Sequence, residues 1–118
     1  MLITVFHLWV PFTLFWLVPF LTWMQFAFHI RSIAEHFAMP VREGVFAKTR
    51  TTIATVFERM FLVPKNVGYH LEHHLYPSVT FFNLPKLHRL LMEKPTYHAT
   101  AHVTRGYWRV VIECLSEV

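Results

Sequence analysis

The chain has 118 residues, of which 54% are hydrophobic and only 15% are charged, and its net charge is +4. Its single cysteine, Cys114, excludes an internal disulfide and a cysteine-rich zinc site, and we interpret it as a packing residue. All eleven Lys and Arg and all seven Asp and Glu lie at Arg31 or later, so an apolar front precedes a basic remainder. The basic residues are interleaved with long apolar stretches, which argues against nucleic acid as a partner and favours a surface that faces anionic lipid headgroups.

The apolar front predicts a membrane-spanning segment. Residues 2–30 carry no charged side chain and exceed the roughly 20 apolar residues that a bilayer requires. Pro11 and Pro19 interrupt the run, so we expect one spanning helix from about residue 11 to 28, with a kink or break near Pro11. Basic residues follow closely, and the positive-inside rule therefore places this end in the cytoplasm: Arg31, Arg42, Lys48 and Arg50.

The remainder predicts three short amphipathic helices besides the segment that contains a histidine cluster. A loop at residues 39–48, with Pro40 and Gly44, precedes them. Apolar side chains then recur at helical spacing, and prolines or capping residues mark the ends. Two of the predicted helices cover residues 51–63 and residues 98–115, the latter despite Gly106. The third begins after its cap Asn83 and ends before Pro95.

The patterns together predict an all-α fold. We find no convincing pair of strands and expect an integral membrane protein with one N-terminal transmembrane helix, or two, within residues 1–30. Residues 31–118 would then form a cytoplasmic cap of short amphipathic helices, and the whole chain would be one structural unit.

The histidine cluster is the strongest functional signal. His70, His73 and His74 lie within five residues, with Asn66 one turn upstream, and a helix would place all four on one side. Converging imidazoles bind first-row transition metals, which leaves iron, zinc, copper and nickel open. The position of Glu72 matches neither zinc-peptidase motif, His-Glu-x-x-His or His-x-x-Glu-His. On a helix Glu72 would face away from His70, and we interpret it as a supporting hydrogen-bond acceptor. We therefore predict a transition-metal site at a membrane boundary.

Two further positions have a functional and an ordinary interpretation. His36 is either another metal ligand or an interfacial residue, and Glu35 either orients a ligand histidine or pairs with Arg31 four residues earlier. Asn66 is either a weak ligand, direct or through water, or a helix cap. The other histidines are predicted to be interfacial or exposed: His7, His29, His88, His98 and His102.

Residues 66–77 resemble the third histidine box, His-x-x-His-His, of the membrane fatty acid desaturases, within the wider superfamily of integral-membrane histidine-box di-iron oxygenases. Residues 82–88 also resemble this family, as do residues 31–36, whose last residue matches its isolated ligand histidine. The resemblance covers nearly the whole chain. The metal ligands that it implies are His36, His70, His73 and His74, with Asn66 as a weak ligand and Glu35 and Glu72 as supporting acceptors.

The resemblance implies an oxidoreductase with two iron ions and O2 as co-substrate that introduces a double bond into a lipid acyl chain. It also implies a membrane lipid or acyl carrier as substrate, an electron donor such as ferredoxin or cytochrome b5, and a histidine box on the cytoplasmic side. Related proteins share the box, so an alkyl or carotenoid hydroxylase is the alternative enzyme. A non-catalytic membrane remnant is the alternative from another class.

One departure from the family pattern concerns the two other histidine boxes, which the family carries upstream. In this sequence the upstream histidines other than His36 are His7 and His29, and they fit no box. We therefore expect the chain to be the C-terminal part of a desaturase that supplies some of the ligands for the di-iron centre. On this expectation the chain alone is inactive.

Overall fold

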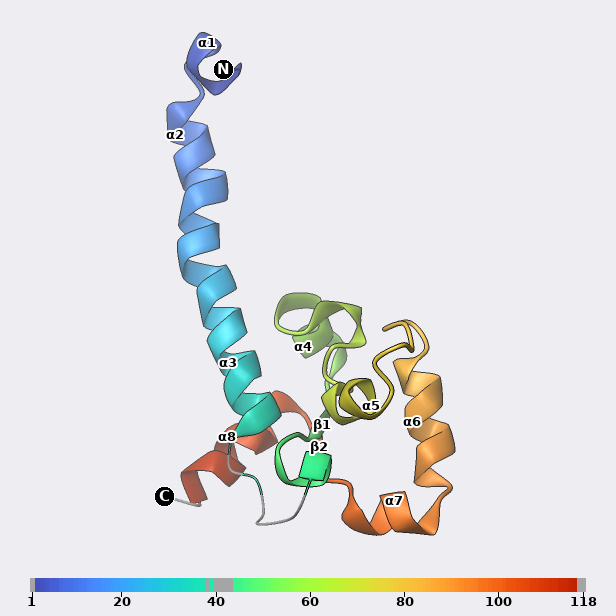
Figure 1. Cartoon of the computed structure of the whole chain (residues 1–118). Helices are drawn as coiled ribbons and strands as arrows, with labels where there is room; N and C mark the ends of the chain where they lie inside the picture. The colour runs from blue at the N-terminus through green and yellow to red at the C-terminus, as the bar shows by residue number, and fades with distance from the viewer. Residues whose placement is uncertain (1, 38, 40–43, 117–118) are drawn as a thin grey trace.

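The computed structural model describes residues 2–37, 39 and 44–116 and shows a long helix that stands beside a cluster of short elements (Figure 1). The continuous helix covers Trp9–His36, and its 28 residues would extend about 42 Å. It is long and apolar enough to cross a membrane, as the sequence predicts. Its parts are α2 (Trp9–Phe12), two π-helical segments η1 (Thr13–Leu17) and η2 (Phe20–Met24), and α3 (Gln25–His36).

The long helix runs through both prolines without a break. The predicted interruption near Pro11 lies instead at His7, whose φ of 51° separates α1 (Leu2–Val5) from α2. Pro11 and Pro19 lack a backbone N–H, and the helix is π-helical on both sides of Pro19, at η1 and η2. The helix is therefore longer than the predicted residues 11–28 at both ends.

The remaining elements are short. They are η3 (Gly44–Ala47), β1 (Thr51–Ile53), α4 (Val56–Phe61), η4 (Pro64–Asn66), α5 (His70–Leu75), α6 (Leu84–Met92), α7 (Pro95–Thr100), β2 (Val103–Arg105) and α8 (Tyr107–Ser116). Of the predicted loop at residues 39–48, Gly44–Ala47 form a 3₁₀ turn, whereas Pro40 lies outside the described residues.

A small parallel sheet corrects the all-α prediction. Strand β1 pairs with β2 in the register Thr51↔Val103, Thr52↔Thr104 and Ile53↔Arg105. The six residues are rich in β-branched side chains, which favour extended backbone. Because the partners lie some fifty residues apart in sequence, no local pattern announces the pairing, and only the tertiary structure supplies it.

The sheet also changes two predicted helices. Residues 51–53 form β1, and α4 begins only after Thr55, which caps it through a reciprocal capping box with Glu58. The predicted helix at residues 98–115 is divided, because β2 interrupts it and Gly106 turns the chain at a φ of 85°. The same Glu58 carboxylate accepts a 2.7 Å hydrogen bond from the Tyr107 backbone N–H and so joins α4 to the start of α8.

Two buried apolar clusters hold the short elements together. One joins the end of α3 to α8 through Ala34, Tyr107 and Val110, and Cys114 packs against it as predicted. The other joins α5, α6 and α7 through Leu71, Leu91 and Tyr97. The clusters lie on either side of β1, which places α5 beside the end of the long helix.

Gly68 provides the first test of this arrangement, because a Cβ atom at this position would lie 2.4 Å from the Thr52 carbonyl oxygen. We expect Gly68→Ala to push α5 away from β1, at a cost of about 1–3 kcal/mol in the free energy of unfolding. Denaturant unfolding in detergent micelles measures this cost. Hydrogen exchange measures the local effect, since the Thr52 N–H donates to the Gly68 carbonyl at 2.8 Å and should lose protection.

Gly44→Ala is the matched control. A Cβ at Gly44 meets no atom within 4 Å, so this change should leave the Thr52 amide protected, although the left-handed backbone at Gly44 adds a local cost. Equal protection of Thr52 in wild type and Gly68→Ala would contradict the predicted contact.

Candidate metal centre

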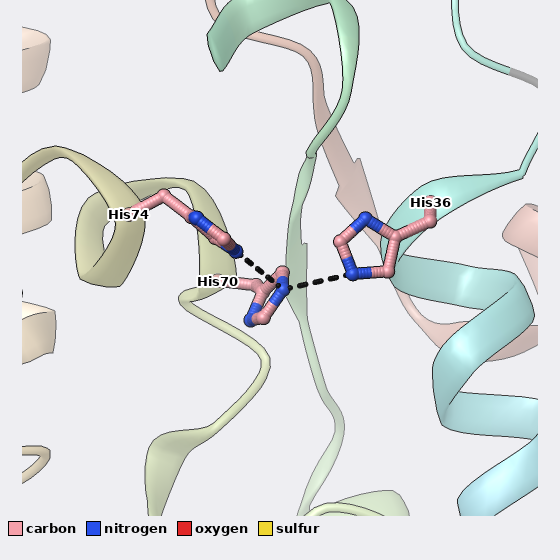
Figure 2. Close-up of side chains that lie close together, drawn as sticks. All are labelled: His36, His70 and His74. Carbon is pink, nitrogen blue, oxygen red and sulfur yellow. Dashed lines mark hydrogen bonds between the residues drawn. The ribbon is translucent and has the colours of Figure 1, made fainter.

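Three histidine side chains from two separate helices converge on one point (Figure 2). His36 is the last residue of α3, whereas His70 and His74 lie one turn apart on α5. The Nε2 atom of His70 lies 3.1 Å from Nε2 of His36 and 3.0 Å from Nε2 of His74. One ring nitrogen of each residue lies within 4.8 Å of the other two.

The donor set fits a single transition-metal ion. Two nitrogens that bind one ion at about 2.1 Å and at right angles to each other are about 3.0 Å apart. A neutral imidazole Nε2 is either a donor or an acceptor in one direction, so the Nε2 atom of His70 cannot satisfy both neighbours by ordinary hydrogen bonds. A cation between the three rings would satisfy all three lone pairs.

The protonation states also suit metal binding. The Nδ1–H of His36 donates to the Lys48 carbonyl oxygen at 2.8 Å, since a carbonyl only accepts, and in the neutral tautomer this places the lone pair on Nε2. Burial, followed by the neighbouring His74 and His36, lowers the pKa of His70 to about 3. Burial and the same kind of neighbours also lower the pKa of His74. The rings of His70 and His74 are therefore neutral at neutral pH.

The structure places the other two predicted ligands away from this point. His73 does not belong to the group of ring nitrogens that converge, so its ligand role stays a prediction. Asn66 lies in η4 with a φ of 57°, and its side-chain amide donates to the Phe81 carbonyl at 3.2 Å. Because α5 begins at His70, Asn66 neither lies on its helix nor caps it.

Glu35 pairs with Arg31, which is one of its two predicted interpretations, whereas its role in orienting a ligand histidine stays a prediction. Its buried carboxylate accepts a 2.7 Å hydrogen bond from Nε of Arg31, four residues earlier. Its second oxygen lies 3.8 Å from Nε2 of His70. Since His70 is neutral, this approach is not an ion pair, and Glu35 places a negative charge beside the point where a cation would bind.

Glu72 faces away from His70, as predicted, and anchors α5 from behind. Its carboxylate is fully buried and accepts hydrogen bonds from the Thr51 hydroxyl at 2.5 Å, the His88 Nδ1–H at 2.5 Å and the Tyr97 hydroxyl at 2.7 Å. Burial acts to raise the pKa of Glu72, but these hydrogen bonds outweigh it and hold the pKa below its ordinary value. The histidine helix is thus fixed to β1, α6 and α7 by one carboxylate.

This network corrects the prediction for His88, which is buried rather than exposed. His102 is also partly buried and contacts Glu113, whereas His7, His29 and His98 are exposed, as predicted. The sequence carried no signal for the roles of Thr51, His88 and Tyr97. Each is 16 to 25 residues from Glu72, and no periodic pattern relates them to it.

Comparison with known proteins agrees with this geometry. The family model described as fatty acid desaturase matches residues 1–106. The chain belongs to the fatty acid desaturase family. A dihydrorhizobitoxine desaturase from Bradyrhizobium elkanii is 38% identical over 90 residues, which cover 75% of this chain and 25% of that protein. The chain thus spans about a quarter of the length of this relative. No solved structure matches the chain.

Family membership confirms the resemblance drawn from the histidine box and its flanking residues. Members of this family generally carry two irons and are typically associated with membranes, and the histidine cluster and the long apolar helix agree with both properties.

The hydrogen bond from Tyr97 to Glu72 gives a test of the anchor behind α5. Tyr97→Phe keeps the ring and removes one donor to a buried carboxylate, so we expect a loss of about 1.5–3 kcal/mol in the free energy of unfolding. Denaturant unfolding in detergent micelles measures the loss. Tyr76→Phe is the control, because the Tyr76 side chain is 41% exposed and should change stability by less than about 0.5 kcal/mol. Equal stability of the two variants would argue against the anchor.

Proposed function

We propose that this chain contributes to an O2-dependent di-iron desaturase that introduces a double bond into a lipid acyl chain. The convergence of the Nε2 atoms of His36, His70 and His74 is the observation that supports this function most directly. In the proposed reaction the acyl chain loses two hydrogen atoms, an external donor supplies two electrons, two protons are taken up from the solvent, and O2 is reduced to two molecules of water. The bound irons would supply the oxidising power for cleavage of an unactivated C–H bond.

The residues of this chain would hold and orient the metal. His36, His70 and His74 would bind one iron as neutral ligands, and His73 is proposed to bind the neighbouring iron. The Lys48 carbonyl fixes the tautomer of His36, while Glu72 fixes α5. Four imidazoles are fewer ligands than two irons require, so we propose that further residues complete the centre.

We propose an integral-membrane location with the histidine cluster on the cytoplasmic side. The cluster lies at the end of the long helix, since His36 is its last residue. Exposed apolar side chains continue from that helix onto α4, where Phe57 is 76% and Met60 is 66% exposed. A site at this boundary can act on a lipid chain without leaving the membrane surface.

An apolar cavity between the long helix and α4 is the proposed place for the acyl chain. Its volume is about 640 Å³, and its lining includes Trp16, Trp23, Phe61 and Leu62, with Arg31 as its one charged residue among those described. Such a lining would let an acyl chain enter from the bilayer without exposing its methylene groups to water.

The curated relative suggests a second candidate substrate, because its name identifies dihydrorhizobitoxine as the compound on which that protein acts. Ferredoxin or cytochrome b5 is the proposed electron donor, and the basic surface beyond residue 30 would attract an acidic carrier. Hydroxylation of an alkyl or carotenoid substrate and a non-catalytic remnant remain the competing functions.

Iron loading provides the direct test of the metal site. The purified chain is loaded with Fe2+ without oxygen in detergent micelles, and bound iron is measured by mass spectrometry. We expect iron well above trace in wild type and an affinity at least about tenfold lower in His70→Ala, because the central ligand is lost. His98→Ala, which removes an exposed histidine on α7, should bind as wild type does. Trace iron in wild type would favour the remnant.

Product analysis tests the reaction. Membranes that contain the 118-residue chain, an electron-donor system and O2 are supplied with acyl lipids or with dihydrorhizobitoxine. We expect no turnover by the chain alone, because its histidines do not fill the coordination of two irons. When further polypeptide that completes the ligand set is supplied together with this chain, we expect an unsaturated product that His70→Ala abolishes. A hydroxylated product would show hydroxylase function instead, and turnover by the chain alone would contradict the partial ligand set.

A further inference from the structure

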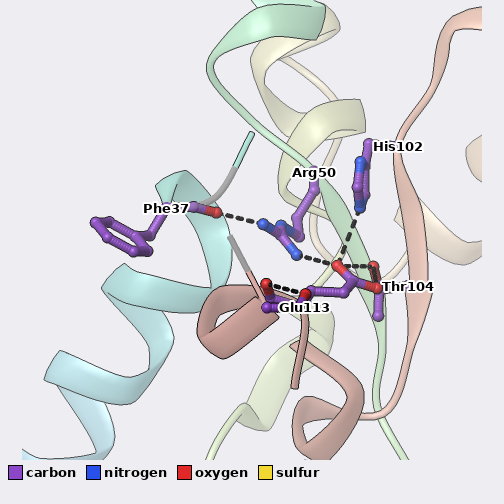
Figure 3. A network of polar contacts seen from close by, with 6 residues as sticks. Phe37, Arg50, His102, Thr104 and Glu113 are labelled. Atoms are coloured by element: carbon purple, nitrogen blue, oxygen red, sulfur yellow. Dashed lines mark hydrogen bonds and ion pairs between the residues drawn. The ribbon is translucent and has the colours of Figure 1, made fainter. Parts of the chain in front are cut away.

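A buried arginine, Arg50, contacts the backbone on both sides of His36. The side chain of Arg50 has no exposed surface, and it lies between the end of α3 and α8 (Figure 3). Its Nη1 donates to the Glu113 carboxylate at 2.6 Å, and its Nη2 donates to the Phe37 carbonyl oxygen. The backbone N–H of Arg50 donates to the Glu35 carbonyl oxygen at 3.3 Å.

These contacts hold the backbone on both sides of His36. The last carbonyl groups of a helix have no partner within the helix, and helix ends therefore fray unless other groups bind them. Arg50 meets the carbonyl before His36 with its backbone and the carbonyl after it with its guanidinium. The Lys48 carbonyl meanwhile accepts from the His36 ring. Residues 48–50 thus fix the backbone and the ring of one candidate ligand.

The same short segment continues to the other two histidines. Thr51 donates to Glu72 on α5, and the Thr52 N–H donates to the Gly68 carbonyl two residues before α5. Residues 50–52 therefore connect the end of α3, which carries His36, to α5, which carries His70 and His74. Movement of Arg50 would change the distance between these two helices.

Glu113 makes the buried position of Arg50 tolerable. An isolated buried cation is costly, and a carboxylate with further hydrogen bonds offsets that cost. The Glu113 carboxylate also accepts from the Thr104 hydroxyl at 3.1 and 3.2 Å and from the His102 ring at 3.2 Å. These donors orient Glu113 and, through it, the guanidinium of Arg50.

We propose that Arg50, held by Glu113, is a positioning residue that sets His36 against His70 and His74 for metal binding. The inference rests on the proposed metal site. A metal ligand must lie within about 0.2 Å of its proper distance, so a loosened helix end weakens binding. Arginine suits this role because two separate nitrogens reach the Phe37 carbonyl and Glu113, whereas lysine has a single nitrogen.

Cobalt binding in the full 118-residue chain tests the proposal, because Co2+ in imidazole sites has a measurable absorption spectrum. The chain is titrated with Co2+ in detergent micelles. We expect Arg50→Gln to weaken Co2+ binding roughly 10- to 100-fold, as the loss of groups that orient metal ligands commonly does. Arg50→Lys and Glu113→Gln, which disturb the fold less, should weaken it in the same direction. Arg109→Gln, an exposed change on α8, should bind as wild type does.

A double-mutant cycle separates positioning from a general loss of structure. If Arg50 acts through His36, then Arg50→Gln should have almost no further effect on Co2+ affinity in a His36→Ala background. A purely structural role would instead give the same loss in both backgrounds. The paramagnetically shifted Nδ1–H signal of His36 in the NMR spectrum of the cobalt protein should be present in wild type and lost in Arg50→Gln.

The outcomes distinguish failure of the metal site from failure of the positioning role. Failure of wild type to bind Co2+ through histidine would overturn the metal site and the positioning role together. Normal binding by wild type, with equal affinity in the Arg50 and Glu113 variants or with additive losses in the cycle, would overturn the positioning role alone.

Discussion

The histidine cluster depends on the hydrogen bonds made by residues 48–52. His36 belongs to the long apolar helix, whereas His70 and His74 belong to α5, and 34 residues separate the two parts of the cluster. The segment before and within β1 binds the helix end on one side and α5 on the other. Pairing of β1 with β2 supports this segment, although the sheet has only two strands. A metal site assembled from separate elements requires a rigid connection of this kind.

Two fully buried charged residues are part of this connection: Arg50 belongs to the segment, and Glu72 accepts a hydrogen bond from Thr51 within it. Neighbouring residues compensate both charges. Glu72 receives three hydrogen bonds from three different elements, and Arg50 faces the Glu113 carboxylate. Such networks cost free energy when one partner is missing, so they favour a single arrangement of the elements that meet in them. Two of those elements, α3 and α5, carry the candidate ligands, which links the stability of the short elements to the geometry of the candidate metal centre.

Much of the local structure could be predicted from the sequence. The charge-free front predicted the long helix, the spacing of His70 and His74 predicted that they share a helix face, and the flanking residues identified the family. The failures occurred where distant residues decide the structure. Ile53 fits the helical spacing of the apolar residues that follow it, yet residues 51–53 pair with β2. Asn66 was assigned to the histidine helix, but a left-handed turn precedes α5.

The sequence alone therefore determined the properties that depend on neighbours within a few residues: the apolar helix and the side chains one turn apart on α5. The tertiary structure decided which of the candidate ligands meet. It brought His36 to His70 and turned Asn66 toward Phe81. It also buried His88 against Glu72 and brought Arg50 to the Phe37 carbonyl oxygen, next to His36. The physical reason is that helical periodicity is local, whereas burial and hydrogen bonding of polar groups depend on the segments that folding brings together.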